Sequence, residues 1–271
     1  MAAPDNELDF EFPTHLRVYK DGRVERLAGT ESLPAGADPQ TGVTSKDVRD
    51  IVPGTEVYVR IYLPKLSNNT QKLPLLVYIH GGAFCLFSPS SAPYHNYLNA
   101  LVAKSQLVAV SVHYRRASEH PLPTAYEDSW AAVQWVASHR GGDGPEALLN
   151  QHADFRRVFL AGDSAGANIV HNLTMRVGNA DAGLNLEILG IALVDPFFGG
   201  SDPDTLRDRG RLYVEVLSRS GWIGMVEIHE VEGEGHCFHL HDLNNEKAKK
   251  RMRRVAGFFN RDMPSPPILG Q

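Results

Sequence analysis

Residues 158–166 are Val158-Phe159-Leu160-Ala161-Gly162-Asp163-Ser164-Ala165-Gly166, and they indicate the fold of this 271-residue chain more strongly than any other stretch. The four apolar residues predict a buried strand, and a helix-like run follows from 168 to 177. A Gly-x-Ser-x-Gly turn between a strand and a helix is the arrangement of a nucleophile elbow, which exposes a serine hydroxyl above the sheet. Glycine at 162 and 166 suits the close backbone approach of such a turn. The stretch therefore predicts an α/β fold with Ser164 as a nucleophile.

A second motif, His80-Gly81-Gly82-Ala83-Phe84, lies upstream and directly follows the apolar run 75–79. Ordinary Gly/Ser turns also match Gly-x-Ser-x-Gly, but a His-Gly-Gly turn before it supplies the second half of an esterase oxyanion hole. The predicted donors are the backbone N–H groups of Gly81, Gly82, Ala83 and Ala165. Each donor of this kind contributes about 3 to 4 kcal/mol to stabilising the transition state. The two motifs together predict attack on an ester carbonyl.

Further motifs make the chain similar to the plant carboxylesterases, which belong to the hormone-sensitive-lipase branch of the α/β-hydrolases and are related to the gibberellin receptors and isoflavanone dehydratases. Besides the two motifs above, the matching segments are Tyr114-Arg115-Arg116-Ala117, Glu119-His120-Pro121-Leu122-Pro123, Tyr126-Glu127-Asp128 and Gly162 to Ile169. The resemblance extends from about Lys46 to Phe259. It implies an α/β-hydrolase fold, small ester substrates and no cofactor.

Apolar runs at strand spacing alternate along the chain with runs at helical spacing. Strands are expected at 56–63, 75–79, 107–112, 158–161, 188–194 and 225–231, and helices at 97–104, 126–139, 168–177, 206–220 and 246–259. This order predicts a mainly parallel sheet with helices on both faces, in which the alternating strand 56–63 forms an edge. Residues 46–271 are expected to form the hydrolase domain, and residues 1–45 an N-terminal cap that packs partly over the site.

A serine nucleophile needs a base, and in α/β-hydrolases the chain order is Ser, then Asp or Glu, then His. The base should lie in the loop after the last strand, here 225–231. Because Gly-His-x-Phe matches the catalytic-histidine loop of the family, the resemblance implies His236 as the base, with His239 and His241 as alternatives. These histidines and Cys237 lie too close together for the ligand spacing of a structural zinc site, so no metal is expected.

Several aspartates compete for the third place in the triad. The segment Asp204 to Gly210 matches the family sequence that starts at the acid, so the resemblance implies Asp204. Asp195 is the alternative because it ends the predicted strand 188–194, where active-site residues of parallel sheets gather. Asp202 is a third candidate.

A deletion is expected immediately before Asp204. In the family an apolar strand leads into the acid, whereas residues 198–203 here are Phe-Gly-Gly-Ser-Asp-Pro. One core strand and part of the lid are therefore expected to be missing, as in a splice form, an imperfect gene model or a genuinely shortened enzyme. The sheet is then expected to close by pairing 188–194 with 225–231, because unpaired ladder groups would otherwise remain.

Composition excludes several other classes of protein. A formal net charge of -5 argues against nucleic acid and anionic membranes as partners. No apolar run is long enough to span a membrane. The two cysteines, Cys85 and Cys237, form no disulfide framework, and the acidic N-terminus carries no secretory signal, so a reducing, cytoplasmic location is expected.

The sequence therefore predicts a serine carboxylesterase that hydrolyses small esters through a Ser164–His236–Asp204 triad and an acyl-enzyme. Three alternatives remain: a gibberellin-receptor-like binding protein without catalysis, an inactive truncated isoform, and a dehydratase. His236 argues against the binding protein, because the resemblance implies an apolar residue there in the receptors. Ser164 argues against the dehydratase, because the resemblance implies Thr at this position in some dehydratases.

Overall fold

The computed structural model describes residues 7–68, 70–178, 183–199, 203–220 and 224–261, with the side chains of 203–205 left out. Its centre is a six-stranded sheet in the order β4-β5-β7-β6-β8-β9. The strands are β4 (Thr44–Val48), β5 (Tyr58–Leu63), β6 (Leu73–Ile79), β7 (Val108–His113), β8 (Ala153–Asp163) and β9 (Gly190–Val194). The pairs β7–β6, β6–β8 and β8–β9 are parallel, and the pairs β4–β5 and β5–β7 are antiparallel. The predicted mainly parallel sheet is confirmed.

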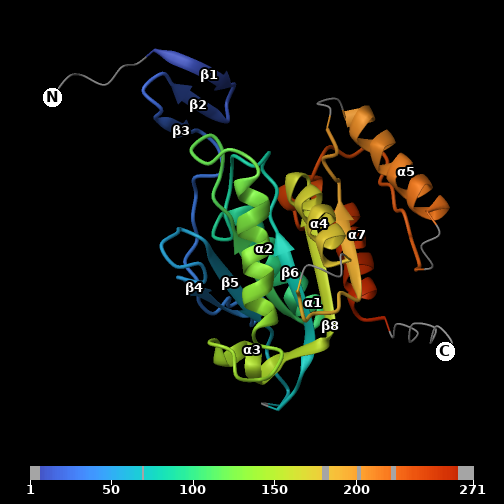
Figure 1. The fold of residues 1–271 in the computed structure, drawn as a ribbon. Helices are drawn as coiled ribbons and strands as arrows, with labels where there is room; N and C mark the ends of the chain where they lie inside the picture. The colour runs from blue at the N-terminus through green and yellow to red at the C-terminus, as the bar shows by residue number, and fades with distance from the viewer. Residues whose placement is uncertain (1–6, 69, 179–182, 200–202, 221–223, 262–271) are drawn as a thin grey trace.

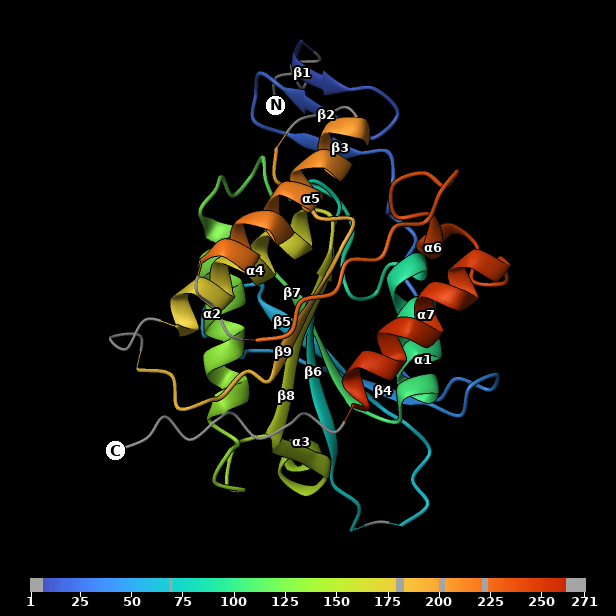
Figure 2. The same cartoon turned by 90° about the vertical axis from the view of Figure 1, so that its right-hand side faces the viewer.

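Helices cover both faces of this sheet, as predicted (Figure 1). One face carries α2 (Thr124–Ala137) and α4 (Ala165–Val177), and the other carries α1 (Ala92–Ser105) and α7 (Glu246–Phe259). Figure 2 shows the sheet between these two helical layers, with α5 (Pro203–Arg219) outside α4. Two short helices, α3 (Ala147–His152) and α6 (Phe238–His241), were not predicted.

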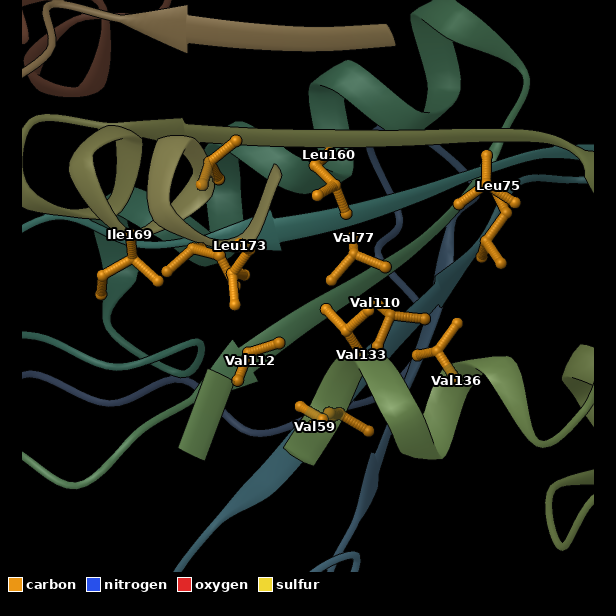
Figure 3. Packing of buried hydrophobic residues seen from close by; sticks show 14 of the residues in the cluster. Val59, Leu75, Val77, Val110, Val112, Val133, Val136, Leu160, Ile169 and Leu173 are labelled. Carbon is orange, nitrogen blue, oxygen red and sulfur yellow. The ribbon is translucent and has the colours of Figure 1, made fainter. Parts of the chain in front are cut away.

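Strands β6 and β7 are buried along their whole length, because helices pack on both of their faces. Val77 and Val110 point toward Val133 and Val136 of α2 on one side (Figure 3). The other face of β6 packs against α1 through the rings of Tyr78, Tyr94 and Tyr97. The core therefore consists of two apolar layers that hold the carboxyl ends of β6 and β8 in fixed positions.

The prediction that 56–63 forms an edge strand is wrong. Strand β5 lies between β4 and β7, and β4 is the edge. The alternation was misleading because the polar positions of β5 are buried as well. Arg60 is 1% exposed and its guanidinium bonds both carboxylate oxygens of Asp47 on β4, at 2.6 and 2.9 Å. A buried cation is tolerated when it is paired in this way.

The prediction of a last strand at 225–231 is also wrong. Residues 225–231 make no strand, and β9 is the last strand that the described residues contribute to the sheet. A strand needs a neighbouring backbone to complete its ladder, and side-chain ion pairs tie this segment down instead. Glu227 pairs with Arg261 at 2.6 Å, and Glu230 pairs with Arg211 of α5. The expected pairing of 188–194 with 225–231 therefore does not occur.

The N-terminal segment forms a small antiparallel sheet of its own, made of β1 (Leu8–Phe12), β2 (Leu16–Tyr19) and β3 (Val24–Arg26). Figure 1 shows it at one end of the molecule, apart from the central sheet. Arg26 of β3 links this sheet to the rest of the chain, because it bonds both carboxylate oxygens of Glu119 at 2.7 Å and the carbonyl oxygen of Cys85 at 2.7 Å. That this segment caps the site stays a prediction.

Candidate active site

Ser164 lies at the junction between β8 and α4, on a strained backbone. Its φ of 51° and ψ of -121° are rare for a residue with a side chain. A Cβ on Gly166 would overlap the carbonyl oxygen of Ile79, and a Cβ on Gly162 would lie 2.6 Å from the carbonyl carbon of Gly166. Both glycines are therefore required by space. The predicted elbow geometry is present in the structure.

His236 faces the serine from the loop before α6. Its Nε2 lies 2.9 Å from Ser164 Oγ, which is hydrogen-bond distance. Partial burial lowers the pKa of His236, the charge of Asp195 raises it, and the charge of Arg251 lowers it. A lowered pKa leaves the imidazole neutral at pH 7, as a general base must be.

The turn after β6 lies directly beside the serine. A Cβ on Gly81 would come within 3.0 Å of Ser164 Cβ, and Gly82 has a φ of 101°. The Gly81 N–H donates to Tyr94 Oη at 3.0 Å and to Asp163 Oδ1 at 3.1 Å, so it is already in use. Within the described part of the chain, nothing accepts a hydrogen bond from the N–H groups of Gly82, Ala83 and Ala165. These three groups are free to bind an oxyanion.

Asp163 is a site residue that the sequence analysis missed. Its carboxylate is 1% exposed and accepts from Tyr78 Oη at 2.9 Å, from Tyr94 Oη at 2.8 Å and from Gly81 N. Burial raises its pKa to about 6, although these hydrogen bonds lower it. The sequence shows that Asp163 lies inside the Gly-x-Ser-x-Gly motif. Its burial and its tyrosine partners could not be predicted, because they depend on other strands and helices. Asp163 therefore ties the elbow to the turn Gly81-Gly82-Ala83, which is called the oxyanion turn below for its predicted role.

His80, the first residue of the His-Gly-Gly motif, is buried and stacks on Tyr114 with ring centroids 4.3 Å apart. Burial lowers its pKa to about 3, so the ring is neutral. Its Nδ1 lies 2.8 Å from the carbonyl oxygen of Gly81. His80 therefore shapes the turn and is not placed as the base.

The three candidate acids differ in where their side chains lie and in whether the structure describes them. Asp195 follows β9 directly, and its Oδ2 accepts from the N–H of Cys237 at 3.0 Å and from Arg251 Nη1 at 2.6 Å. This places its carboxylate beside the His236 loop. Asp204 falls in the first turn of α5, but its side chain lies outside the described residues, as does the whole of Asp202.

The fallback histidines occupy other environments. His239 is 1% exposed, packs on Tyr97 with ring centroids 5.1 Å apart and has a pKa lowered to about 4, chiefly by burial. His241 is exposed. Among the residues that the structure describes, no group of three or more His, Cys, Asp or Glu side chains could hold a metal ion. None of the described helices could cross a membrane.

Comparison with known proteins gives consistent relatives. A family model for the alpha/beta hydrolase fold matches residues 76–203. The chain is 39% identical to probable carboxylesterase 5 of Arabidopsis thaliana over 94% of this chain and 99% of that protein. It is 38% identical to 2-hydroxyisoflavanone dehydratase of Glycyrrhiza echinata over 93% of this chain and 96% of that protein.

Solved structures show the same fold at lower identity. The thermostable carboxylesterase EstE1 from a metagenomic library superimposes with a TM-score of 0.66 at 23% identity, over 86% of this chain and 90% of that one. An esterase from Pyrobaculum calidifontis gives 0.64 at 22% identity, over 80% and 84%.

The comparisons also bear on the expected deletion. The alignment with carboxylesterase 5 runs over 318 positions, more than the 271 residues of this chain, so that relative contains residues without a counterpart here. The match to the family model ends at residue 203, next to the predicted junction. In the described part of the chain residues 225–231 form no strand and β9 is an edge of the sheet, and the deletion of a strand before Asp204 stays a prediction.

Proposed function

Since the chain belongs to the plant carboxylesterase family of the α/β-hydrolases, we propose that it is a serine carboxylesterase that hydrolyses small carboxylic esters. The observation that carries the proposal is the 2.9 Å contact between Ser164 Oγ and His236 Nε2 on a nucleophile elbow. The free N–H groups of Gly82, Ala83 and Ala165 beside it support the same chemistry.

The proposed reaction has two halves. His236 Nε2 takes the hydroxyl proton as Ser164 Oγ attacks the ester carbonyl, and the oxyanion binds to the free N–H groups of the turn and elbow. The tetrahedral intermediate collapses, His236 returns the proton to the leaving alcohol, and an acyl-serine remains. Water, deprotonated by His236, then releases the carboxylic acid by the same steps.

The third member of the triad is proposed to be Asp195 in this shortened chain. Its carboxylate bonds the N–H of Cys237, next to His236, and its charge favours the imidazolium that forms during attack. Asp204, which the family motif favours, is the alternative. We expect Asp195→Asn to lower kcat by a factor of about 10³ or more and Asp204→Asn to leave it near wild type. The opposite pattern would assign the acid to Asp204.

The test of the esterase proposal is hydrolysis of p-nitrophenyl acetate by the purified chain. Ser164→Ala should remove nearly all turnover, whereas Ser67→Ala, in an exposed turn whose hydroxyl bonds Gln71, should keep it. A Ser164→Ala variant with the wild-type rate would exclude the mechanism. Folded protein without turnover in any assay would favour a non-catalytic binding protein or an inactive isoform.

A dehydratase is the second candidate, because two relatives carry the name 2-hydroxyisoflavanone dehydratase. Elimination of water needs a base and an oxyanion site but no acyl-serine. Dehydration of a 2-hydroxyisoflavanone that survives Ser164→Ala and disappears in His236→Ala would support this candidate. Loss of dehydration in both variants, or no dehydration by the parent chain, would remove it.

The small N-terminal sheet is proposed to cap the site from the side of the oxyanion turn. The contacts of Arg26 with Glu119 and with the carbonyl oxygen of Cys85 support this role. A cytoplasmic location is proposed as well, supported by the free thiols of Cys85 and Cys237. Location of a fluorescent fusion in plant cells tests that part.

A further inference from the structure

A hollow of about 350 Å³ is separate from the candidate active site, because neither Ser164 nor His236 is among the residues that line it. It lies between the segment after β3, the residues that lead into α1, and the paired ends of β5 and β7. Its polar wall includes Thr30, Tyr58, Ser88, Ser90, His113 and Arg116. A volume of this size suits a small organic molecule rather than a single ion.

Arg116 gives this hollow a positive charge without a direct ion-pair partner among the described residues, and the nearby Glu119, which pairs with Arg26, acts on it only through its charge. Arg116 Nη1 donates to the carbonyl oxygen of Phe87 at 2.9 Å, which uses one of the five guanidinium N–H groups. No described carboxylate lies within ion-pair distance of it. Its neighbours differ, since Arg26 pairs with Glu119 and Arg115 pairs with Asp128, both at 2.7 Å. Arg116 is therefore a partly buried cation that still has donors available.

His113 adds a second group that lacks a partner. It is 8% exposed, it lines the hollow, and its Nδ1 has no hydrogen-bond partner within the described residues. Its ring packs on Tyr58, with centroids 4.6 Å apart. Burial, the neighbouring His80 and the charges of Arg116, Arg49 and Arg26 lower its pKa to about 3. The surroundings of this ring thus carry positive potential.

The remaining polar groups fit an anion with an apolar body. Ser88 and Ser90 bring hydroxyl groups 2.8 Å apart, and Tyr58 Oη lies 3.5 Å from Ser90 Oγ. Among the described residues that line the hollow, the acidic one is Glu31, and it is exposed. The rings of Tyr58 and His113 offer flat apolar surface beside the donors.

We propose that this hollow is a binding site for a small organic carboxylate, held by the Arg116 guanidinium and by the hydroxyl groups of Ser88 and Ser90. A planar guanidinium matches the two oxygens of a carboxylate and forms charge-assisted hydrogen bonds to them. The bound carboxylate supplies the direct ion-pair partner that Arg116 lacks among the described residues. Arg116 bonds the carbonyl oxygen of Phe87 and Arg26 bonds that of Cys85, so both arginines that line the hollow are held by the segment that follows Gly82 and Ala83.

The test is isothermal titration calorimetry of the full chain with sodium benzoate, with benzamide as the neutral isostere. We expect benzoate to bind and benzamide to bind at least about tenfold more weakly, because hydrogen bonds to a charged group are the stronger ones. Equal affinity for the two, or no heat with benzoate at millimolar concentration, would overturn the proposal.

Variants locate the binding. Arg116→Gln should weaken benzoate at least about tenfold, whereas Arg156→Gln, which changes an arginine whose side chain is 92% exposed, should leave it unchanged. Glu31→Gln changes an exposed side chain and should leave the stability of the fold unchanged. It should tighten benzoate about threefold, since it removes a like charge from the rim. Unchanged affinity in both Arg116→Gln and Glu31→Gln would place benzoate elsewhere, for example in the catalytic site, and would refute the assignment.

Discussion

The buried carboxyl group of Asp163 should make the free energy of unfolding depend on pH, whereas an asparagine at the same position should not. The pKa of Asp163 is about 6 in the folded chain, above the ordinary value of 3.8. A raised folded pKa means that folding favours the protonated acid. Its contribution to stability is therefore fully present below pH 3.8 and is lost as the pH rises through 6. The shift corresponds to about 3 kcal/mol in all, of which about 2 kcal/mol falls between pH 4.5 and 7.5.

The substitution Asp163→Asn isolates this effect. Asparagine stays neutral, so the free energy of unfolding of the variant, relative to the parent, should rise by about 2 kcal/mol from pH 4.5 to 7.5. The comparison with the parent is essential because His80, His113 and His239, whose pKa values are lowered by burial, add an opposite pH dependence that both proteins share. Their contribution is present above pH 6.5 and is lost toward lower pH.

The assay is urea denaturation followed by tryptophan fluorescence at four or more pH values. An unfolding free-energy difference between the two proteins that stays constant with pH would refute the reasoning. It would mean that the hydrogen bonds from Tyr78, Tyr94 and Gly81 outweigh the burial and keep the Asp163 carboxylate ionised throughout.

Three further predictions concern the elbow, the base and the sheet. Gly166→Ala should cost about 3 kcal/mol or more, because its Cβ has no room, and should appear as loss of soluble, cooperatively melting protein. The acid limb of the pH profile of kcat/KM should have its midpoint below pH 6.5, because burial lowers the pKa of His236. Arg251→Gln should move that midpoint to higher pH, because the charge of Arg251 also lowers this pKa, and a move to lower pH would contradict the electrostatic argument. Asp47→Asn should destabilise the chain by about 3 kcal/mol in urea denaturation, because Arg60 is left buried and unpaired, and a loss below about 1 kcal/mol would show that Arg60 finds another partner.

Local sequence patterns predicted most of the helices and strands, because the apolar spacing and the end signals of such an element lie within its own residues. The helix expected at 246–259 is α7 (Glu246–Phe259), whose apolar stripe and Asn245 cap lie within one segment. The strand expected at 107–112 is β7, one residue displaced. The strand prediction for 225–231 was wrong because a strand also needs a neighbouring backbone to complete its hydrogen bonds, and its own residues do not determine whether that neighbour is present.

By itself the sequence determined the elbow and the His-Gly-Gly turn, because each motif carries its backbone requirements in consecutive residues. The tertiary structure decided which of the three candidate histidines faces Ser164, because His236 and Ser164 are 72 residues apart in the chain. Only the tertiary structure decided which donors remain free and which acids lie close. The Gly81 N–H is occupied by Asp163 and Tyr94, and Asp195 lies beside the His236 loop through its bond to Cys237. Burial and charge at a residue are set by neighbours distant in sequence, and those neighbours also left Arg116 partly buried without a direct ion pair among the described residues.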